Sequence, residues 1–327
     1  MDEYIIRKIS KKRGNKYYHK YYDKKEKEIK DKGYIEKIIN GIYISPAYDN
    51  VKINIRNNNK IRAIGYDTEK RPQYIYNKKF IEEQKDKKFN HMSSFGKKFT
   101  KMNQKINEDL YSTKDSKEKQ VALILKLIME CHFRVGNERY SKKYKSYGTT
   151  TLENKHLKVK KDHVIIDFIG KKKVRNKCTV RNKKVVKNLK EKKKTLKKND
   201  RIFTYRKGND YFNIQSSDVN KYLKQFGKFS AKNFRTWGAN VELIVQINKF
   251  CKKEEVKTKK KIDECIKKSI QEVALKLHNT SAVCRSNYLD PELIQFFTND
   301  SDGFIRHFDV ASKEELYKKY VSFLDNL

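Results

Sequence analysis

The spacing of apolar residues changes beyond residue 76, and this change limits the possible folds more than any other feature of the chain. Before it, residues 51–55 and 61–66 alternate apolar and polar side chains, as half-buried strands do, and residues 74–76 close the set. After it, apolar residues recur at helical spacing, first in residues 121–131. We therefore expect an α+β protein with a small β-rich N-terminal domain followed by a larger, mainly helical domain.

A charged stretch without a core pattern, residues 82–90, is expected to link the two domains, which we place at 1–85 and 86–327. A chain of 327 residues is long enough to give each domain a core. Residues 1–30 show little periodicity, and residues 34–76 are interpreted as β throughout.

Later segments add a hairpin to the helical domain. Strands at 164–169 and 179–180 are expected to flank a basic turn, and amphipathic spacing predicts helices at 262–277 and 314–324. The mostly charged residues 251–261 are expected to form a solvated helix or a connector.

The charge balance points to a polyanionic partner. The chain has 79 Lys and Arg against 40 Asp and Glu, a formal net charge of +39 that runs along nearly the whole length. Nucleic acid is the first candidate for such a charge. The alternative is a solvated basic surface that results from a lysine- and asparagine-rich coding bias.

The five cysteines are odd in number and scattered, with no CxxC pair. This pattern argues against a disulfide framework or a structural zinc site and indicates a reducing compartment. No apolar run approaches the roughly 20 residues that span a bilayer, and the N-terminus lacks a signal-peptide core. We therefore expect a soluble intracellular protein without a membrane partner.

The residue types available for chemistry favour covalent catalysis. The sequence shows no clustered carboxylates of the kind that metal-dependent nucleases use, and no Gly-rich phosphate loop of the kind that binds ATP. Arg, Lys and Tyr are abundant instead, and they can supply charge stabilisation, an acid and a nucleophile for a phosphodiester. We expect no metal site and no cofactor. With 21 tyrosines in the chain, however, no single Tyr is informative by itself.

Ordered motifs give these residue types a specific meaning. In order along the chain they are Arg-Val-Gly-Asn at 134–137, Ser-x-Gly-x-x-Thr-Leu at 146–152, Gly-Lys at 170–171, Lys-x-x-Arg-Thr-Trp-Gly at 232–238, and Asn-Thr-x-Ala-Val-Cys-Arg-x-x-Tyr at 279–288. Together they resemble the catalytic set of type IB DNA topoisomerases, in the small branch found in poxviruses, giant viruses and bacteria. Segments at 44–48, 63–67 and 71–76 resemble the N-terminal part of the same branch, so the resemblance covers roughly residues 35 to 292.

The resemblance implies a role for each matched residue. Tyr288 would attack the scissile phosphate and form a 3′-phosphotyrosyl bond, which stores the bond energy so that no ATP is required. Arg134 and Arg235 would donate to the non-bridging oxygens, and Lys171 on its hairpin would protonate the 5′-oxygen. Asn279 takes the place of the His found in poxviral members. The preceding His278, where relatives often carry Gly, is the competing candidate.

The resemblance also implies contacts with duplex DNA. Gln73, Tyr74 and Tyr76 correspond to positions that face the major groove, whereas Tyr140 and Lys232 correspond to phosphate-positioning groups. The two domains would close around DNA as a monomeric clamp that takes no small-molecule substrate and relaxes supercoils by strand rotation. Such a protein would act in a viral factory, a virion or the cytoplasm if it is viral, and in the nucleoid if it is bacterial.

Two other functions share part of this pattern. Tyrosine site-specific recombinases use a similar Arg-Lys-Arg-Tyr set, but they usually carry His where this chain has Lys232. A non-catalytic DNA-packaging protein would explain the charge but would not need the ordered motifs. Mutation of Tyr288 separates these classes, because a packaging protein forms no covalent adduct with DNA.

Overall fold

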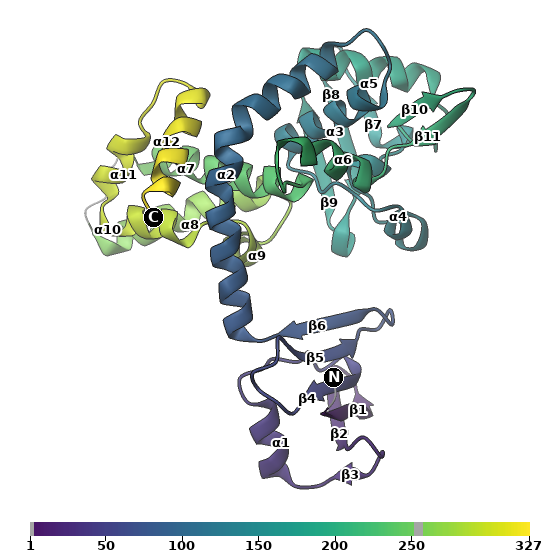
Figure 1. The fold of residues 1–327 in the computed structure, drawn as a ribbon, viewed down its shortest axis with the longest axis vertical. Coiled ribbons are helices and arrows are strands. Elements are labelled where there is room, and N and C mark those ends of the chain that lie inside the picture. Colours follow the sequence, from purple (N-terminus) through teal and green to yellow (C-terminus); the bar gives the residue numbers. More distant parts are fainter. Residues whose placement is uncertain (1–2, 252–257) are drawn as a thin grey trace. The chain divides into compact units, whose positions relative to one another are not determined.

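The computed structural model describes residues 3–251 and 258–327, and the chain divides into two compact units between Lys88 and Phe89 (Figure 1). The expected connector at 251–261 lies largely outside the described residues. The N-terminal unit is an antiparallel sheet with one helix, and the second unit is mainly helical with two small sheets. The predicted α+β class is confirmed.

The N-terminal unit is built on six strands in the order β3-β2-β1-β4-β5-β6. Its elements are β1 Tyr4–Arg13, β2 Lys16–Tyr22, β3 Glu28–Ile29, α1 Lys32–Ile39, β4 Asp49–Asn54, β5 Ile61–Tyr66 and β6 Pro72–Tyr76. Its core is small and consists of Ile5, Ile38, Val51, Ile53 and Ala63. A core of this size relies on the continuous hydrogen-bonded ladder around it.

Two expectations for this unit were wrong. Residues 32–39 form the helix α1 rather than β structure, because Ile35 and Ile38 lie three apart on its buried face and the side chain of Asp31 caps its N-terminus. The hairpin β1–β2 was not predicted at all. No residue of β2 is buried, so the hairpin has too little apolar alternation to be recognised from sequence.

The stretch 82–90, which was expected to link the two domains, lies inside one continuous helix, α2 Lys78–Tyr111, and the boundary between the two units falls within it. Glu, Gln and Lys are good helix formers, so a charged stretch without an apolar stripe can still be helical. From Phe89 onward the helix presents buried residues at spacings of three and four: Phe89, Met92, Phe95, Phe99, Met102, Ile106 and Leu110. The helix thus enters the core of the second unit.

The second unit is organised around α3 Lys117–Cys131, which is buried along most of its length. The other helices are α4 Glu138–Tyr144, α5 Lys183–Thr195, α6 Ser216–Leu223, α7 Ala231–Cys251, α8 Lys259–Lys276, α9 Ser281–Asn287, α10 Pro291–Asn299, α11 Ser301–Phe308 and α12 Lys313–Asp325. The strands β7 Leu157–Val159, β8 Val164–Ile169 and β9 Arg175–Val180 form one sheet, and β10 Thr204–Lys207 pairs with β11 Asp210–Asn213. Short 3₁₀ turns cover Thr149–Thr151, Asn154–His156, Lys171–Lys173 and Lys224–Phe226. The predicted hairpin is therefore β8–β9, with Ile169 paired to Arg175.

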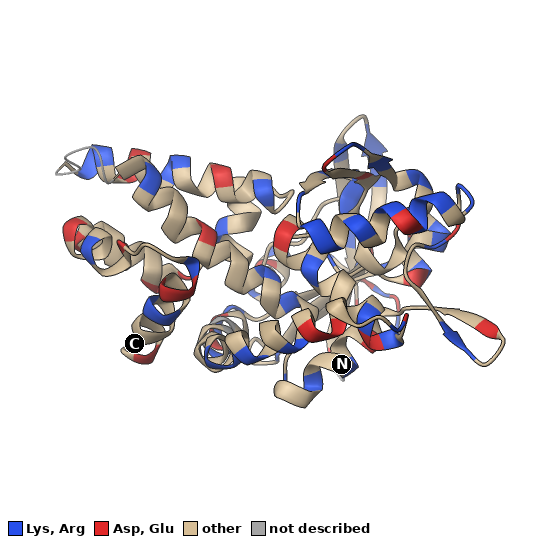
Figure 2. Cartoon of the chain, turned by 90° about the horizontal axis from the view of Figure 1, so that it is seen from above, with Lys and Arg blue, Asp and Glu red and all other residues tan. Residues whose placement is uncertain are grey.

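The positive charge lies almost entirely at the surface. Lys and Arg recur along the helices of the chain (Figure 2). Apart from histidines, the buried charged side chains among the described residues are Arg7, Arg62, Arg235 and Asp290. In the described ranges no helix is long and apolar enough to cross a membrane.

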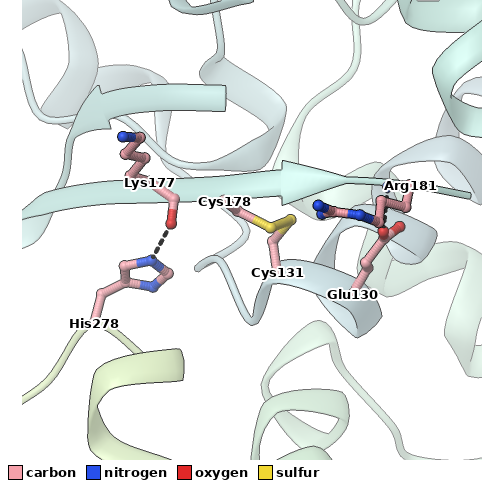
Figure 3. The surroundings of a disulfide bond; sticks show 6 residues. All are labelled: Glu130, Cys131, Lys177, Cys178, Arg181 and His278. Carbon is pink, nitrogen blue, oxygen red and sulfur yellow. Dashed lines mark hydrogen bonds between the residues drawn. A yellow bond between two sulfur atoms is a disulfide. The ribbon is translucent and has the colours of Figure 1, made fainter. Parts of the chain in front are cut away.

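The cysteines differ from expectation, because four of the five are paired. Cys131 at the end of α3 is bonded to Cys178 on β9, with 5.7 Å between their Cα atoms (Figure 3), and Cys251 is bonded to Cys265. Cys284 is free and buried. Residues 131 and 178 are 47 positions apart, so only the packing of α3 against the sheet brings them together.

Reduction of the Cys131–Cys178 bond is expected to lower stability by about 4 kcal/mol, since the bond closes a long loop in the unfolded chain. For a unit of this size that corresponds to roughly 10 °C in Tm. The measurement is a thermal melt with and without a dithiol in a variant with Cys251→Ser and Cys265→Ser, which keeps only this bond. The matched control carries Ser at all four of these cysteine positions, so its Tm should not respond to the dithiol. An unchanged Tm in the first variant would contradict the expectation.

Candidate active site

Arg134 follows α3 in a segment whose backbone is fastened to the motif at 146–152. The carbonyl oxygen of Arg134 accepts hydrogen bonds from the backbone N–H and the hydroxyl of Thr149, at 2.8 and 3.1 Å. Thr150 binds the carbonyl of Val135 in the same way, at 2.7 and 2.9 Å. Two glycines make this contact possible: a Cβ on Gly148 would lie 2.5 Å from the Cα of Gly136, which itself has a φ of +101°.

Arg235 lies on α7 and is only 2% exposed. Its Nη2 donates to the Tyr288 hydroxyl and to the carbonyl of Leu277, both at 3.3 Å. Its Nε and Nη1 have no hydrogen-bond partner in the described part of the chain. The buried guanidiniums of Arg7 and Arg62 each leave one nitrogen unpaired, whereas Arg235 leaves two. Because a buried charged donor without a partner is costly, this arrangement is typical of a site for an anion.

Tyr288 is the residue that follows α9, and it is 8% exposed. The Arg235 guanidinium carbon lies 5.2 Å from the centre of its ring. Asn240, five residues after Arg235 on α7, donates to the carbonyl of Tyr288 at 3.0 Å and accepts from the N–H of Asp290 at 2.8 Å. One helix therefore holds both the hydroxyl and the backbone of this tyrosine.

The electrostatics of the pocket favour ionisation of Tyr288. Burial alone would raise the pKa of its hydroxyl, but the charge and hydrogen bond of Arg235, followed by Arg134 and Lys232, outweigh burial and lower the pKa below its usual value. A phenol that loses its proton more readily is a better nucleophile near neutral pH.

Asn279 lies two residues beyond the C-cap of α8, beside Arg134. Its backbone N–H donates to the carbonyl of Ala274 at 3.0 Å, which closes the last turn of the helix. Its Oδ1 accepts from Nη2 of Arg134 at 2.8 Å, and its Nδ2 is buried without a partner in the described residues. The hydrogen bond from Arg134 thus fixes the orientation of the Asn279 amide and leaves its Nδ2 free to donate to another acceptor.

Four of the five predicted catalytic residues are therefore brought together. Arg134 is hydrogen-bonded to Asn279, and Arg235 is hydrogen-bonded to Tyr288. The positive charge of Arg134 also lowers the pKa of Tyr288. These four residues carry three buried nitrogens without a partner in the described chain, Nε and Nη1 of Arg235 and Nδ2 of Asn279. No group of three or more His, Cys, Asp or Glu that could hold a metal ion occurs within the described ranges. The chemistry that this donor set supports is stabilisation of an oxyanion next to a phenol nucleophile.

Lys171, the fifth predicted residue, is not in contact with this group. It is exposed at the tip of the β8–β9 hairpin, and its side chain makes no hydrogen bond or ion pair with any residue that the structure describes. Lys172 and Lys173 have φ angles of +61° and +59°, which are uncommon for residues other than glycine. The hairpin base is tied to the Arg134 region, because the N–H of Tyr147 donates to the carbonyl of Ile169 at 2.9 Å.

The predicted DNA-contact residues lie on both units. In the helical unit Tyr140 on α4 is 47% exposed and Lys232 at the start of α7 is exposed. In the N-terminal unit Tyr74 and Tyr76 are exposed on the edge strand β6 and stack at 6.4 Å, whereas the Gln73 amide donates to Asp67 at 3.0 Å. Alternation along a strand places Gln73 on the opposite face from the two tyrosines.

Asn240 was missed by sequence reasoning, although its side chain binds the carbonyl of Tyr288 through Nδ2 and the N–H of Asp290 through Oδ1. A signal was present: an Asn that is fully buried in the middle of an apolar helix must have hydrogen-bond partners. Its burial, however, is visible only in the folded protein.

Acidification is expected to destabilise the helical unit through His132, which caps α3. Burial, followed by the positive charges of Arg235, Lys276 and Lys313, lowers the pKa of His132 to about 3. The unfolded chain, with an ordinary His pKa, binds a proton at a higher pH than the folded one. The contribution of neutral His132 to the free energy of unfolding is therefore fully present above about pH 6.5. The free energy of unfolding should fall by about 2 kcal/mol between pH 7 and pH 5.

The measurement for His132 is the free energy of unfolding at pH 7 and pH 5 for the native protein and for His132→Asn. Asn tolerates the left-handed φ of +52° at this position and does not titrate. His156, with a pKa lowered to about 4 by burial, contributes in the same direction in both proteins, so the difference isolates His132. Equal pH dependence in the two proteins would refute the assignment.

Comparison with known proteins adds a family to this geometry. Residues 77–299 match the family described as the catalytic core of eukaryotic DNA topoisomerase I. The chain is 31% identical to DNA topoisomerase 1B of Acanthamoeba polyphaga mimivirus over 305 residues, which are 90% of this chain and 89% of that protein. It is 25% identical to DNA topoisomerase 1B of vaccinia virus (strain Copenhagen) over 185 residues, 55% of each chain. It is also 28% identical to DNA topoisomerase 1 of Daucus carota over 136 residues, 41% of this chain and 16% of that protein.

Proposed function

Because this chain belongs to the type IB DNA topoisomerases, we propose that it relaxes supercoiled DNA through a covalent intermediate on Tyr288, without ATP or a metal ion. The single observation that supports the assignment of the residues is the set of unpartnered buried donors on Arg235 and Asn279 beside the Tyr288 hydroxyl. A non-bridging phosphate oxygen would satisfy them.

In the proposed cleavage step, the Tyr288 hydroxyl loses its proton to solvent, and its oxygen forms a bond to the scissile phosphorus while the bond from phosphorus to the 5′-oxygen breaks. Arg235, Arg134 and the Asn279 amide donate to the non-bridging oxygens, where negative charge increases in the transition state. Lys171 donates a proton to the departing 5′-oxygen. The products are a 3′-phosphotyrosine and a free 5′-hydroxyl, and religation is the reverse reaction.

The energy of the cleaved bond is kept in the phosphotyrosine, so one DNA end can rotate about the intact strand and be resealed without an external energy source. Lys171 must approach the phosphate when DNA binds, and its exposed position on the hairpin tip is compatible with such a movement.

We expect relaxation of supercoiled plasmid in EDTA without nucleotide. The charge on the transition state would be stabilised by guanidinium and amide donors of the chain itself, so chelation should leave the rate within about twofold of the rate in Mg²⁺-free buffer. Gel electrophoresis of the plasmid topoisomers over time measures this. Strict dependence on Mg²⁺ or on ATP would overturn the proposal.

Duplex DNA is the partner of this family, and we propose that Gln73, Tyr74, Tyr76, Tyr140 and Lys232 contact it in this chain. We further propose that the protein acts as a monomer, because one chain supplies Arg134, Arg235, Asn279 and Tyr288 to one pocket. Since the mimivirus and vaccinia relatives are viral, we propose that it works in the factory, virion or host cytoplasm of a virus.

A further inference from the structure

His278 occupies a backbone position that usually favours glycine. It follows the C-cap of α8 with a φ of +55°, and its N–H donates to the carbonyl of Leu275 at 3.1 Å. Together with the Asn279 bond to Ala274, this forms the αL turn that commonly ends a helix. A residue other than glycine at such a φ is strained, and residues of this kind are concentrated at functional sites.

The His278 ring holds the free edge of β9. Its Nε2 lies 3.1 Å from the carbonyl oxygen of Lys177, and since a carbonyl only accepts, Nε2 carries the proton (Figure 3). β9 is the last strand in the order β7-β8-β9, so its outer carbonyls have no strand partner. The ring also packs against Phe133, with centroids 5.5 Å apart.

The next residue of β9 is fastened to the other side of the pocket. Cys178 is bonded to Cys131, which lies three residues before Arg134 (Figure 3). Two consecutive residues of β9 are thus tied to the two segments that carry Arg134 and Asn279. β9 itself is the outgoing strand of the hairpin that carries Lys171, and it begins only four residues after this lysine. β9 is paired with β8 along its length, so two adjacent bonds on its outer side fix the direction of the whole hairpin relative to the pocket.

We propose that His278 is a positioning residue that aligns the Lys171 hairpin with the phosphate pocket, acting through its hydrogen bond to the carbonyl of Lys177. The proposal rests on the proposed function, because it requires Lys171 to donate the proton to the leaving oxygen. His278 therefore does not compete with Asn279 for the phosphate. It acts on the departure of the 5′-oxygen, whereas Asn279 donates to a non-bridging oxygen.

The test compares single-turnover cleavage by the native protein, His278→Gly, His278→Gln and Lys171→Ala. Glycine removes the ring and suits the φ of +55°, so this variant should fold at least as well as the native protein. Glutamine is the matched control, because its amide nitrogen can replace Nε2 as the donor. Each protein is given a duplex at whose mapped cleavage site the 5′-bridging oxygen is either retained or replaced by sulfur. A thiolate leaves without protonation, so the sulfur substrate does not need the acid.

On the oxygen substrate, His278→Gly should be roughly tenfold slower, the scale of one lost hydrogen bond, and His278→Gln within about threefold of native. On the sulfur substrate His278→Gly should come within about twofold of native, and DNA binding and Tm should not fall for any of these variants. An equal defect of His278→Gly on both substrates, or an equal defect of Gln and Gly, would overturn the role of His278, provided that sulfur restores Lys171→Ala. If sulfur does not restore Lys171→Ala, the proposed acid itself is wrong.

Discussion

Replacement of Tyr288 by Phe is expected to reduce plasmid relaxation below detection while duplex binding stays within about twofold. The substitution removes one oxygen from a side chain that is 8% exposed and keeps the packing of its ring. In the part of the chain that the structure describes, no other hydroxyl donates to or accepts from Arg235, so no second nucleophile is in place. Denaturing electrophoresis of protein incubated with labelled duplex measures the covalent adduct directly.

The control for this experiment is Tyr320→Phe, the same substitution in another buried tyrosine. The Tyr320 hydroxyl has no hydrogen-bond partner in the described chain, so its removal should leave relaxation unchanged and stability equal or higher. Relaxation retained by Tyr288→Phe would mean that a different residue attacks, and the interpretation of the motif at 279–288 would be wrong. Loss of relaxation in both variants would point to a general folding defect.

Arg235→Ala is expected to slow cleavage on the order of 10³-fold, and Arg235→Lys still about 10²-fold. Alanine removes the donor at 3.3 Å from the Tyr288 hydroxyl and both nitrogens that are free for phosphate. Lysine keeps the positive charge but not the planar arrangement of donors. Because Arg235 is the principal cation that lowers the pKa of Tyr288, burial should dominate in Arg235→Ala and raise this pKa.

The readout is the rate of adduct formation as a function of pH in single-turnover experiments. In Arg235→Ala the rise of the rate with pH should move to higher pH than in the native protein, in addition to the overall loss. In Arg235→Lys this shift should be smaller, since a cation remains. Equal rates for the native protein and Arg235→Lys would show that only the charge matters and that the free guanidinium nitrogens have no role.

The elements that the sequence predicted well are those with a clear apolar pattern. The strands β4 and β5 and the pair β8–β9 were recognisable from spacing because each packs one face on a core, and the helix α3 was recognisable because it is apolar and buried along most of its length. The errors fall on elements without such a pattern. The strands of the β1–β2 hairpin bury only Ile5 and Arg7, and residues 82–88 of α2 are all charged or amide residues. α1 is short, and its isoleucines are equally compatible with a strand.

For the site, the sequence alone determined the residue types and their order along the chain. Each of the motifs at 134–137, 232–238 and 279–288 is a short contiguous stretch, so its residue types and spacing can be recognised without the fold. The charge balance of the sequence indicated a polyanionic partner, with a solvated basic surface as the alternative, since net charge can be summed without knowing the fold. Tertiary structure decided the rest. It placed Asn240 against the backbone of Tyr288, tied His278 to Lys177, and joined Cys131 to Cys178 across 47 residues, which corrected the expectation of unpaired cysteines. Contacts between segments far apart in the chain depend on how the helices and the sheet pack, and no local pattern records that packing.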